Sequence, residues 1–206
     1  MYLNLTIAIF SGYFIGSIPT AVWIGKLTHK LDIREHGSGN PGATNVFRVL
    51  GWKLGLFVLL VDIAKGFIPV FFLPLFFPVE SMGMLYPLLI GTATIAGHIF
   101  TIFAGFRGGK GVGTTAGVFA ALIPFSFIAA LLTFLIVFFT SRYVSFSSIM
   151  GALVVILSIP LFQWLNIQNL DVEIWIIVYL ICFTIIFKHF DNIKRIRNGE
   201  ENKIKL

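Results

Sequence analysis

Charged residues are scarce in this 206-residue sequence, where Asp, Glu, Lys and Arg together fill 12% of the positions. That share is about half of what an ordinary soluble domain carries, and 57% of the residues are hydrophobic. The scarcity excludes a protein whose main solvent is water. Five stretches have no charged residue at all: 1–25, 81–106, 111–141, 143–170 and 174–187. Most of them can cross a hydrocarbon core, which takes roughly 20 apolar residues, so the sequence predicts an all-α, polytopic integral membrane protein.

Cysteine is nearly absent, and its scarcity excludes two further classes. The single Cys182 offers neither a disulfide nor a cysteine-based metal site, and within an apolar run it is expected to be a small membrane hydrophobe. The acidic residues are scattered rather than clustered as ligands of a hard cation, so we expect no metal and no cofactor. Residues 1–25 lack the basic leader of a cleaved signal peptide, which predicts a retained first helix.

The net charge of +6 comes from basic residues in short segments between the apolar stretches. This distribution favours anionic membrane lipid and small phosphates as partners and disfavours nucleic acid, which would need a basic soluble face. Every Lys and Arg except Lys65 lies in four segments: 26–53, 107–110, Arg142 and 188–206. The positive-inside rule places these segments in the cytoplasm, and it places the connections that hold Glu80, Asp171 and Glu173 outside.

The charge pattern also fixes the number and direction of the crossings. The stretch 111–141 begins at Lys110 and ends at Arg142, both predicted inside, so it must cross an even number of times. Pro124 near its middle predicts two short helices of roughly 12 to 16 residues each that turn within the membrane. The prediction is a single domain over residues 1–206 with seven transmembrane segments, the N-terminus outside and the C-terminus cytoplasmic. The other spans are expected at 1–25, 54–77, 83–104, 146–166 and 174–187.

Residues 36–48 have the composition of an anion cradle. The glycines Gly37, Gly39 and Gly42 allow the backbone to turn successive N–H groups toward one point. Arg48 adds a fork for phosphate oxygens, and further donors come from Ser38, Asn40, Thr44 and Asn45. The structural alternative is a tight connection between helices, but the segment has more donors than a turn needs.

A second glycine-rich segment, residues 106–115, leads directly into an apolar stretch. Gly108, Gly109 and Lys110 resemble the end of a phosphate-binding P-loop, where a phosphate rests on a helix N-terminus. The full Walker spacing and a preceding strand are absent, so the pattern disfavours an ATPase. The structural alternative is a basic anchor at the membrane surface.

Other polar residues lie within or beside the predicted spans. Asp62 and Lys65 are three residues apart and share a helix face, which fits either a functional path or an ion pair that braces the bundle. His98 is expected to donate a hydrogen bond between helices. Arg142 and Ser145 fit a further inner turn, and the basic segment after Lys188 fits either a grip on anionic lipid or, through His189 and Asn192, part of a site at the surface.

Taken together, these residues resemble the bacterial acyl-phosphate-dependent glycerol-3-phosphate acyltransferase family. The resemblance spans nearly the whole chain and rests on segments in the family's order: 16–19, 32–34, 37–48, 62–66, 97–98, 106–112, 142–145 and 189–193. It implies a seven-helix enzyme of the bacterial inner membrane whose active site faces the cytoplasm. It further implies transfer of an acyl group from acyl phosphate to the 1-hydroxyl of glycerol 3-phosphate, giving lysophosphatidic acid and phosphate as the first step of phospholipid synthesis. A soluble enzyme that forms acyl phosphate is the implied partner.

The resemblance also assigns residues. It implies catalytic roles for Ser38, Arg48, Lys110 and His189. It implies substrate binding by Gly37, Gly39, Asn40, Gly42, Thr44, Asn45, Gly108, Gly109, Ser145 and Asn192. The chain departs from the family pattern at Phe190, where a basic residue is usual, and at Gly113, where alanine is usual.

We hypothesise direct transfer without a covalent acyl-enzyme, because no serine sits on a strained nucleophile elbow. Arg48 and Lys110 would stabilise charge on the leaving phosphate. Either His189 or a substrate phosphate oxygen would take the proton from the attacking hydroxyl. A transporter or flippase that uses Asp62, Lys65 and His98 is the alternative from another class, but it predicts an internal repeat, and we find none. A lipid-binding scaffold would not need two glycine-rich anion loops.

Overall fold

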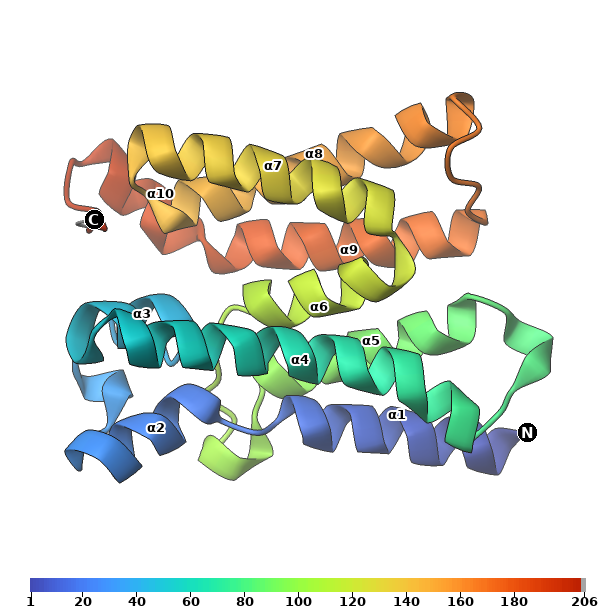
Figure 1. Cartoon of the computed structure of the whole chain (residues 1–206), viewed down its shortest axis with the longest axis horizontal. Helices are drawn as coiled ribbons and strands as arrows, with labels where there is room; N and C mark the ends of the chain where they lie inside the picture. The colour runs from blue at the N-terminus through green and yellow to red at the C-terminus, as the bar shows by residue number, and fades with distance from the viewer. Residues whose placement is uncertain (205–206) are drawn as a thin grey trace. The chain divides into compact units, whose positions relative to one another are not determined.

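The computed structural model describes residues 1–204 and is built from helices (Figure 1). Lys205 and Leu206, the end of the predicted basic tail, lie outside the described residues. The chain divides into two compact units, Met1–Leu122 and Ile123–Leu206. The first unit contains α1 (Tyr2–Gly16), α2 (Thr20–His29), α3 (Ala43–Leu50), α4 (Trp52–Phe76), α5 (Leu85–Ile99) and α6 (Val112–Leu122), with short 3-10 turns η1 (Ile33–Glu35), η2 (Glu80–Met82) and η3 (Ile102–Ala104). The second contains α7 (Pro124–Ser141), α8 (Val144–Trp164), α9 (Val172–Lys188) and α10 (Phe190–Arg197).

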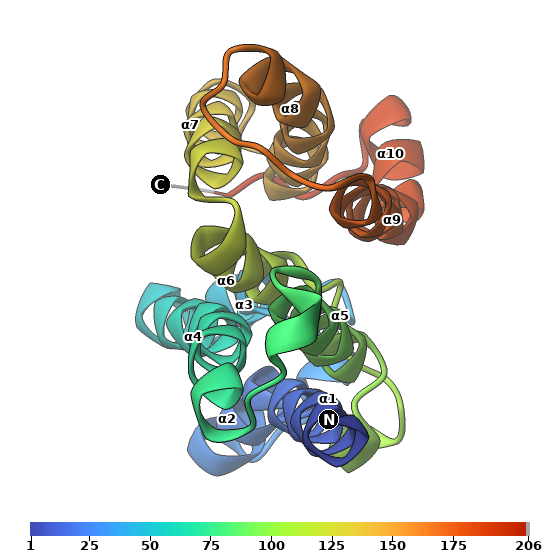
Figure 2. The ribbon, with the colours of Figure 1, turned by 90° about the vertical axis from the view of Figure 1, so that its right-hand side faces the viewer.

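Helix α4 is the centre of the first unit. It packs against α6, α3, α5 and α1, while α1 lies along α5 (Figure 2). Glycines allow the closest of these approaches, because a Cβ on Gly66 would overlap the backbone carbonyl of Thr114, and a Cβ on Gly97 would overlap that of Tyr13. Small residues at such contacts are typical of membrane bundles, where close packing rather than the hydrophobic effect holds helices together.

We expect Gly97→Ala to lower stability, since the added methyl group meets rigid backbone of α1 and the two helices must move apart. Overpacking of this kind costs about 1–3 kcal/mol. Thermal unfolding of the purified protein in detergent measures the loss. Gly151→Ala on α8 is the matched control, because its Cβ would lie 3.4 Å from the carbonyl oxygen of Ala130, an ordinary contact. Equal melting temperatures for the two variants would contradict the α1–α5 contact.

The first predicted span is present, since Tyr2–His29 is apolar and long enough to cross a membrane, but it consists of two helices instead of the one continuous helix expected over residues 1–25. The break falls at Ser17–Pro19, between α1 and α2, where Pro19 has no N–H to continue the ladder. The carbonyls near the break find partners elsewhere: Thr101 Oγ1 donates to Ser17 O, and Lys65 Nζ donates to Ile18 O at 3.1 Å. In hydrocarbon, unsatisfied backbone groups are costly, so these two side chains make the break possible.

The second unit is an antiparallel helix arrangement in which α8 packs against both α7 and α9. The predicted break in 111–141 is confirmed: α6 ends at Leu122 and α7 starts at Pro124. Proline suits the first helical position, because an N–H group at this position would have no intrahelical partner. The expected lengths were wrong, however, because α6 has 11 residues and α7 has 18.

Five helical segments among the described residues are long and apolar enough to cross a membrane, and a sixth results if α9 and α10, bent by 45°, count as one. Many large apolar side chains are exposed along these segments, including Phe76 at 73% and Leu157 at 68%. On a protein in water such surfaces would cause association, whereas lipid tails cover them in a bilayer. The chain is therefore a multi-pass membrane protein.

Candidate active site

The first loop, residues 36–42, turns sharply ahead of α3. Gly37 and Gly39 adopt left-handed backbone angles, with φ of 62° and 72°, which glycine reaches without strain. Gly42 is extended, with φ of −138°, so its role differs from that of the other two. The sequence prediction treated residues 36–48 as one cradle, but α3 begins at Ala43, which places Thr44, Asn45 and Arg48 on a helix.

Asn45 braces this loop from below. Its side chain is 1% exposed, its Nδ2 donates to Ile33 O at 3.0 Å and to His36 O at 2.9 Å, and its Oδ1 accepts from the Ser38 N–H at 2.9 Å. Both amide hydrogens are therefore used inside the protein. This geometry makes Asn45 a residue that shapes the loop, and its contact with substrate stays a prediction.

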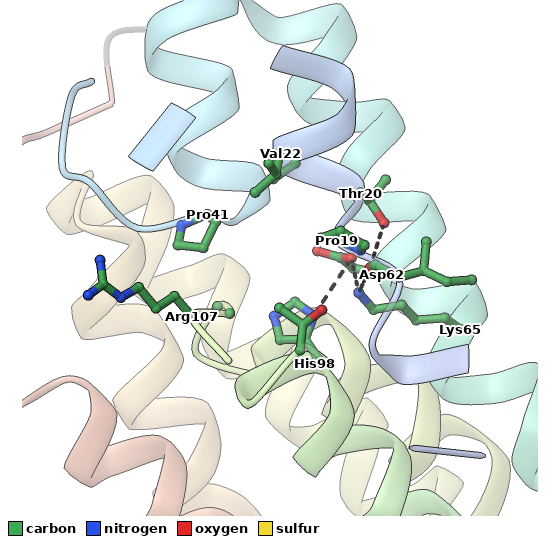
Figure 3. A pocket seen from close by; sticks show the side chains of 13 residues that line it. Pro19, Thr20, Val22, Pro41, Asp62, Lys65, His98 and Arg107 are labelled. Atoms are coloured by element: carbon green, nitrogen blue, oxygen red, sulfur yellow. Dashed lines mark hydrogen bonds and ion pairs between the residues drawn. The ribbon is translucent and has the colours of Figure 1, made fainter. Parts of the chain in front are cut away.

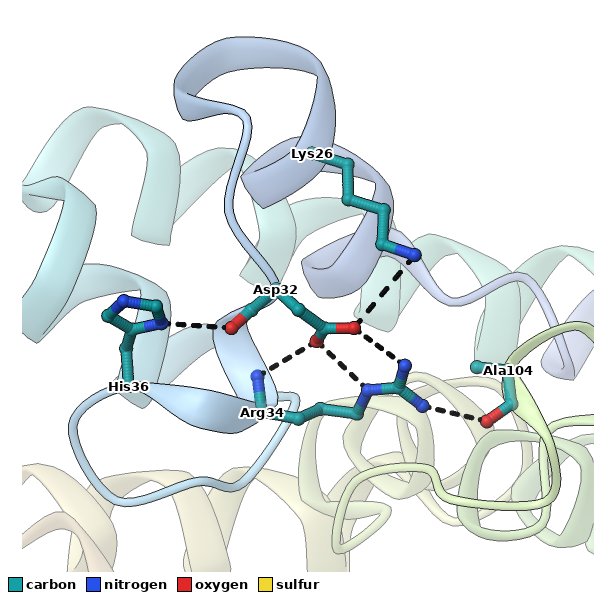
Figure 4. A network of polar contacts seen from close by, with 5 residues as sticks. All are labelled: Lys26, Asp32, Arg34, His36 and Ala104. Atoms are coloured by element: carbon teal, nitrogen blue, oxygen red, sulfur yellow. Dashed lines mark hydrogen bonds and ion pairs between the residues drawn. The ribbon is translucent and has the colours of Figure 1, made fainter.

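A polar network joins the first loop to the segment that precedes the second (Figure 4). Arg34 donates to Asp32 from Nε at 2.9 Å and from Nη2 at 2.6 Å, while its Nη1 donates to Ala104 O at 2.9 Å. Lys26 Nζ lies 3.9 Å from the same carboxylate. The hydrogen bonds from Arg34 lower the pKa of Asp32 to about 2. Arg34 is thus held as a strut between η1 and η3.

We expect Asp32→Asn to release this strut and to lower stability by about 1.5–3 kcal/mol, the worth of a hydrogen bond to a charged group. Because the folded-state pKa is depressed, the stabilisation is complete above the ordinary carboxyl pKa of 3.8 and is lost as the pH falls toward 2. Thermal unfolding at pH 7 checks the change, with Glu35→Gln, an exposed neighbour, as the control. If both variants melt alike, the strut is not a stabilising element.

The second loop, residues 107–110, folds back onto the end of α5. Gly108 N donates to Ile99 O at 3.1 Å, and Gly109 N donates to His98 O at 3.2 Å. A Cβ on Gly108 would overlap the His98 carbonyl, and one on Gly109 would overlap the His98 ring. These two amides are engaged by α5, so the glycines are required here for close packing. The expected contact of this segment with phosphate stays a prediction, for which the N–H groups in the first turn of α6 are further candidates.

Both loops line one pocket in the first unit (Figure 3). About 240 Å³ of space lies among the lining residues, with open solvent included, so the pocket is shallow and partly open. The first loop contributes Pro41 to the lining, and the second loop contributes Arg107, Gly108 and Gly109. The remaining lining comes from the α1–α2 break and from buried polar residues of α4 and α5: Ile18, Pro19, Thr20, Ala21, Val22, Asp62, Lys65, His98 and Thr101. Three lining residues were not predicted from the sequence, Thr20, Thr101 and Arg107, although Thr20 directly follows segment 16–19 of the family resemblance.

The predicted site residues of the first unit surround these loops. Ser38 is exposed in the first loop, and Asn40, Thr44 and Arg48 are half-buried in it or in the first turns of α3. Lys110 is half-buried between Gly109 and the start of α6. None of these five residues lines the pocket, whose own basic lining residues are Lys65 and Arg107.

A second polar cluster lies within the second unit, and its centre is Glu201, which the sequence analysis missed. Glu201 Oε1 accepts from Ser145 Oγ at 2.8 Å and from Asn192 Nδ2 at 2.7 Å, and Oε2 accepts from Arg195 Nε at 2.9 Å. Two residues predicted from the sequence, Ser145 and Asn192, are thus brought together by one buried carboxylate. A backbone hydrogen bond joins the same two segments, because Ile204 N donates to Arg142 O at 3.1 Å.

We expect Glu201→Gln to destabilise this cluster by about 1.5–3 kcal/mol, because the new amide N–H would face the Arg195 donor. Burial alone would raise the pKa of Glu201, but the hydrogen bonds from Arg195, Asn192 and Ser145 lower it below its ordinary value. The stabilisation is therefore present at neutral pH and is lost as the pH falls through the lowered pKa. Thermal unfolding against Glu200→Gln, the exposed neighbouring residue, measures the effect. A Glu201→Gln variant as stable as that control would show that the carboxylate does not organise the cluster.

His189 is 3% exposed at the junction of α9 and α10. Its Nδ1 lies 2.8 Å from Ile185 O, and because a carbonyl can only accept, Nδ1 carries the hydrogen. In the neutral ring the lone pair is then on Nε2, which is the protonation state that a general base needs.

Comparisons with known proteins agree on one family. The model of the family described as glycerol-3-phosphate acyltransferase matches residues 6–199. A glycerol-3-phosphate acyltransferase of Listeria monocytogenes serovar 1/2a is 48% identical over 206 residues, covering 100% of this chain and 99% of that protein. One of Chlorobium luteolum is 40% identical and covers 93% of each chain.

Two solved structures have the same fold. Both are crystal structures of PlsY, an integral membrane glycerol 3-phosphate acyltransferase, one in a glycerol 3-phosphate form and one in a lysophosphatidic acid form. Each is 34% identical to this chain and covers 98% of it; the TM-scores are 0.85 and 0.82, and the match covers 96% and 95% of the respective PlsY chains.

Proposed function

Because the chain belongs to the glycerol-3-phosphate acyltransferase family, we propose that it transfers a fatty acyl group from acyl phosphate to the 1-hydroxyl of glycerol 3-phosphate. It is an acyltransferase of phospholipid synthesis, which decides against the transporter and scaffold alternatives. The products are lysophosphatidic acid and inorganic phosphate. A soluble enzyme that makes acyl phosphate would supply the donor.

The observation that carries the proposal is the convergence of two glycine-rich loops on one pocket of the first unit. The reaction brings together two molecules that each carry a phosphate, so it needs basic and N–H donors at more than one point. Ser38 in the first loop, Arg48 on α3 and Lys110 at the end of the second loop provide them. Gly37, Gly39, Asn40, Gly42 and Thr44 shape or line the first loop, and Gly108 and Gly109 fix the second.

In the proposed reaction the glycerol oxygen attacks the acyl carbonyl carbon, and the bond from that carbon to the phosphate oxygen breaks. The electron pair leaves with the phosphate, whose charge Arg48 and Lys110 stabilise. The hydroxyl proton goes either to His189 Nε2 or to a phosphate oxygen of a bound substrate. A maximal rate of His189→Ala within a few fold of wild type would exclude His189 as the base.

For the topology, we propose seven crossings, with α6 as the short additional one, the N-terminus outside and the C-terminus cytoplasmic. The distribution of Lys and Arg supports this orientation, and it puts both loops at the cytoplasmic face of the bacterial inner membrane. We further propose that residues 1–206 act as one catalytic domain, since the family match extends over both compact units. Thiol labelling of single cysteines placed at residues 2 and 200, in a variant without Cys182, tests the orientation.

The activity test uses the purified protein in detergent or lipid with palmitoyl phosphate as donor. We expect phosphate release that depends on glycerol 3-phosphate and no turnover of acyl-CoA. Turnover of acyl-CoA in place of palmitoyl phosphate would overturn the proposed donor. Radiolabelled acyl chain trapped on the protein would overturn direct transfer.

A further inference from the structure

Two buried charged residues inside the membrane-spanning part of the first unit have no role in the proposed reaction. Asp62 and Lys65 on α4 are 4% and 5% exposed, and Lys65 Nζ lies 2.7 Å from Asp62 Oδ1. His98 on α5 is 7% exposed, and its Nδ1 lies 3.8 Å from the same oxygen. Charges in such a place are costly and call for an explanation beyond packing.

The buried triad of Asp62, Lys65 and His98 lines the pocket (Figure 3), and two of its members contact different parts of the pocket wall, while Asp62 lies between them. Lys65 Nζ reaches the Ile18 carbonyl at the α1–α2 break. The ring of His98 lies directly under Gly109, close enough to leave no room for a Cβ there, and the His98 carbonyl accepts the Gly109 N–H. The triad therefore connects the α1–α2 break to the underside of the second loop.

The electrostatics fit a supporting role. A lone carboxylate under a phosphate-binding loop would repel the substrate, and Lys65 at 2.7 Å cancels the charge of Asp62. The 3.8 Å separation between His98 Nδ1 and Asp62 is longer than a hydrogen bond, so the pair does not form a tight proton relay. Asp62 instead lies beside the ring without a direct hydrogen bond to it.

We propose that Asp62, Lys65 and His98 are positioning residues that hold the second loop in the conformation that binds a phosphate-bearing substrate. The proposal rests on the proposed function only in that this substrate is taken to be glycerol 3-phosphate or acyl phosphate. The triad acts on substrate affinity through the loop and takes no part in the bond-making step.

The main test is the double variant Asp62→Asn with Lys65→Met, which removes both charges with little change in volume and leaves no unpaired buried ion. We expect it to fold and to raise KM for at least one phosphate-bearing substrate about tenfold or more, while kcat stays within about threefold. Thr92→Val, on α5 and outside the pocket lining, is the control for a general effect of substitution in the bundle. A folded double variant with wild-type KM would overturn the proposal, as would a kcat loss of about 100-fold at unchanged KM.

A second pair of variants keeps the proposal testable if the double variant does not fold. His98→Gln places an amide near the position of Nε2 under Gly109, and His98→Asn places one near Nδ1 facing Asp62. We expect His98→Gln to retain substrate affinity better than His98→Asn, since the loop rests on the Nε2 side of the ring. Equal affinities would overturn the proposal.

Direct binding separates this inference from the proposed function. Calorimetric titration with glycerol 3-phosphate, without any acyl donor, reports loop integrity whether or not acyl phosphate is the donor. Weaker binding by the variants supports the triad even if palmitoyl phosphate gives no turnover. Unchanged glycerol 3-phosphate binding by the variants, together with a wild-type KM for acyl phosphate, leaves the proposed function intact and rejects the triad.

Discussion

Gly108→Ala is expected to lower kcat/KM at least about 100-fold, because displacement of catalytic or binding groups by about 1 Å has this effect. A Cβ at position 108 would overlap the carbonyl of His98, which is backbone at the end of α5 and cannot rotate away. The second loop must therefore lift off α5 and lose the hydrogen bond from Gly108 N to Ile99 O. Lys110, two residues further on, moves with it. Steady-state kinetics with palmitoyl phosphate and glycerol 3-phosphate measure the loss.

Gly113→Ala is the matched control, since it adds the same methyl group to the same segment. Its Cβ would lie 3.2 Å from the Cβ of Asp62, a distance that a shift of a few tenths of an ångström relieves. We expect Gly113→Ala to stay within about fivefold of wild type. If Gly108→Ala kept comparable activity, the close packing of the loop on α5 would not matter for function.

The helical architecture could be predicted from the sequence because it depends on local properties. The long uncharged stretches predict membrane-crossing helices through the cost of burying charge, and Pro124 marks the break between α6 and α7 through its missing N–H. The break at Ser17–Pro19 was missed, although Pro19 carries the same signal. Its stability depends on Lys65 and Thr101, which are distant in sequence.

The candidate site could be predicted only at the level of its segments. Glycine and asparagine composition indicated the two loops, but it could not tell a donor that faces a substrate from one that braces the backbone. Asn45 is the example, because its two amide hydrogens are used by Ile33 and His36. Glu201 was missed for a related reason: in a basic tail an acidic residue looks solvated, and only the fold shows that Ser145, Asn192 and Arg195 surround it.

Lys110→Met is expected to lower kcat/KM about 10²–10³-fold, the usual effect of removing one donor that stabilises transition-state charge. Lys110 is the last residue of the second loop and precedes the first turn of α6, whose N–H groups have no intrahelical partners. A phosphate at this helix end would receive both those donors and the ammonium group. Methionine keeps the length and the apolar stem of the side chain, so the substitution removes the charge with little change in packing.

Lys53→Met is the control, because Lys53 is an exposed cation on α4 that contacts only the ring of Trp52 among the described interactions. Both variants lose one positive charge, so a general weakening of attraction to anionic substrates would affect them equally and would fade with added salt. We expect the loss in Lys110→Met to persist at high salt, since a partly buried contact is screened less than a surface charge. Equal, salt-sensitive losses in the two variants would show that Lys110 only adds to the general positive charge of the membrane face. Arg48 would then be the better candidate for binding the phosphate.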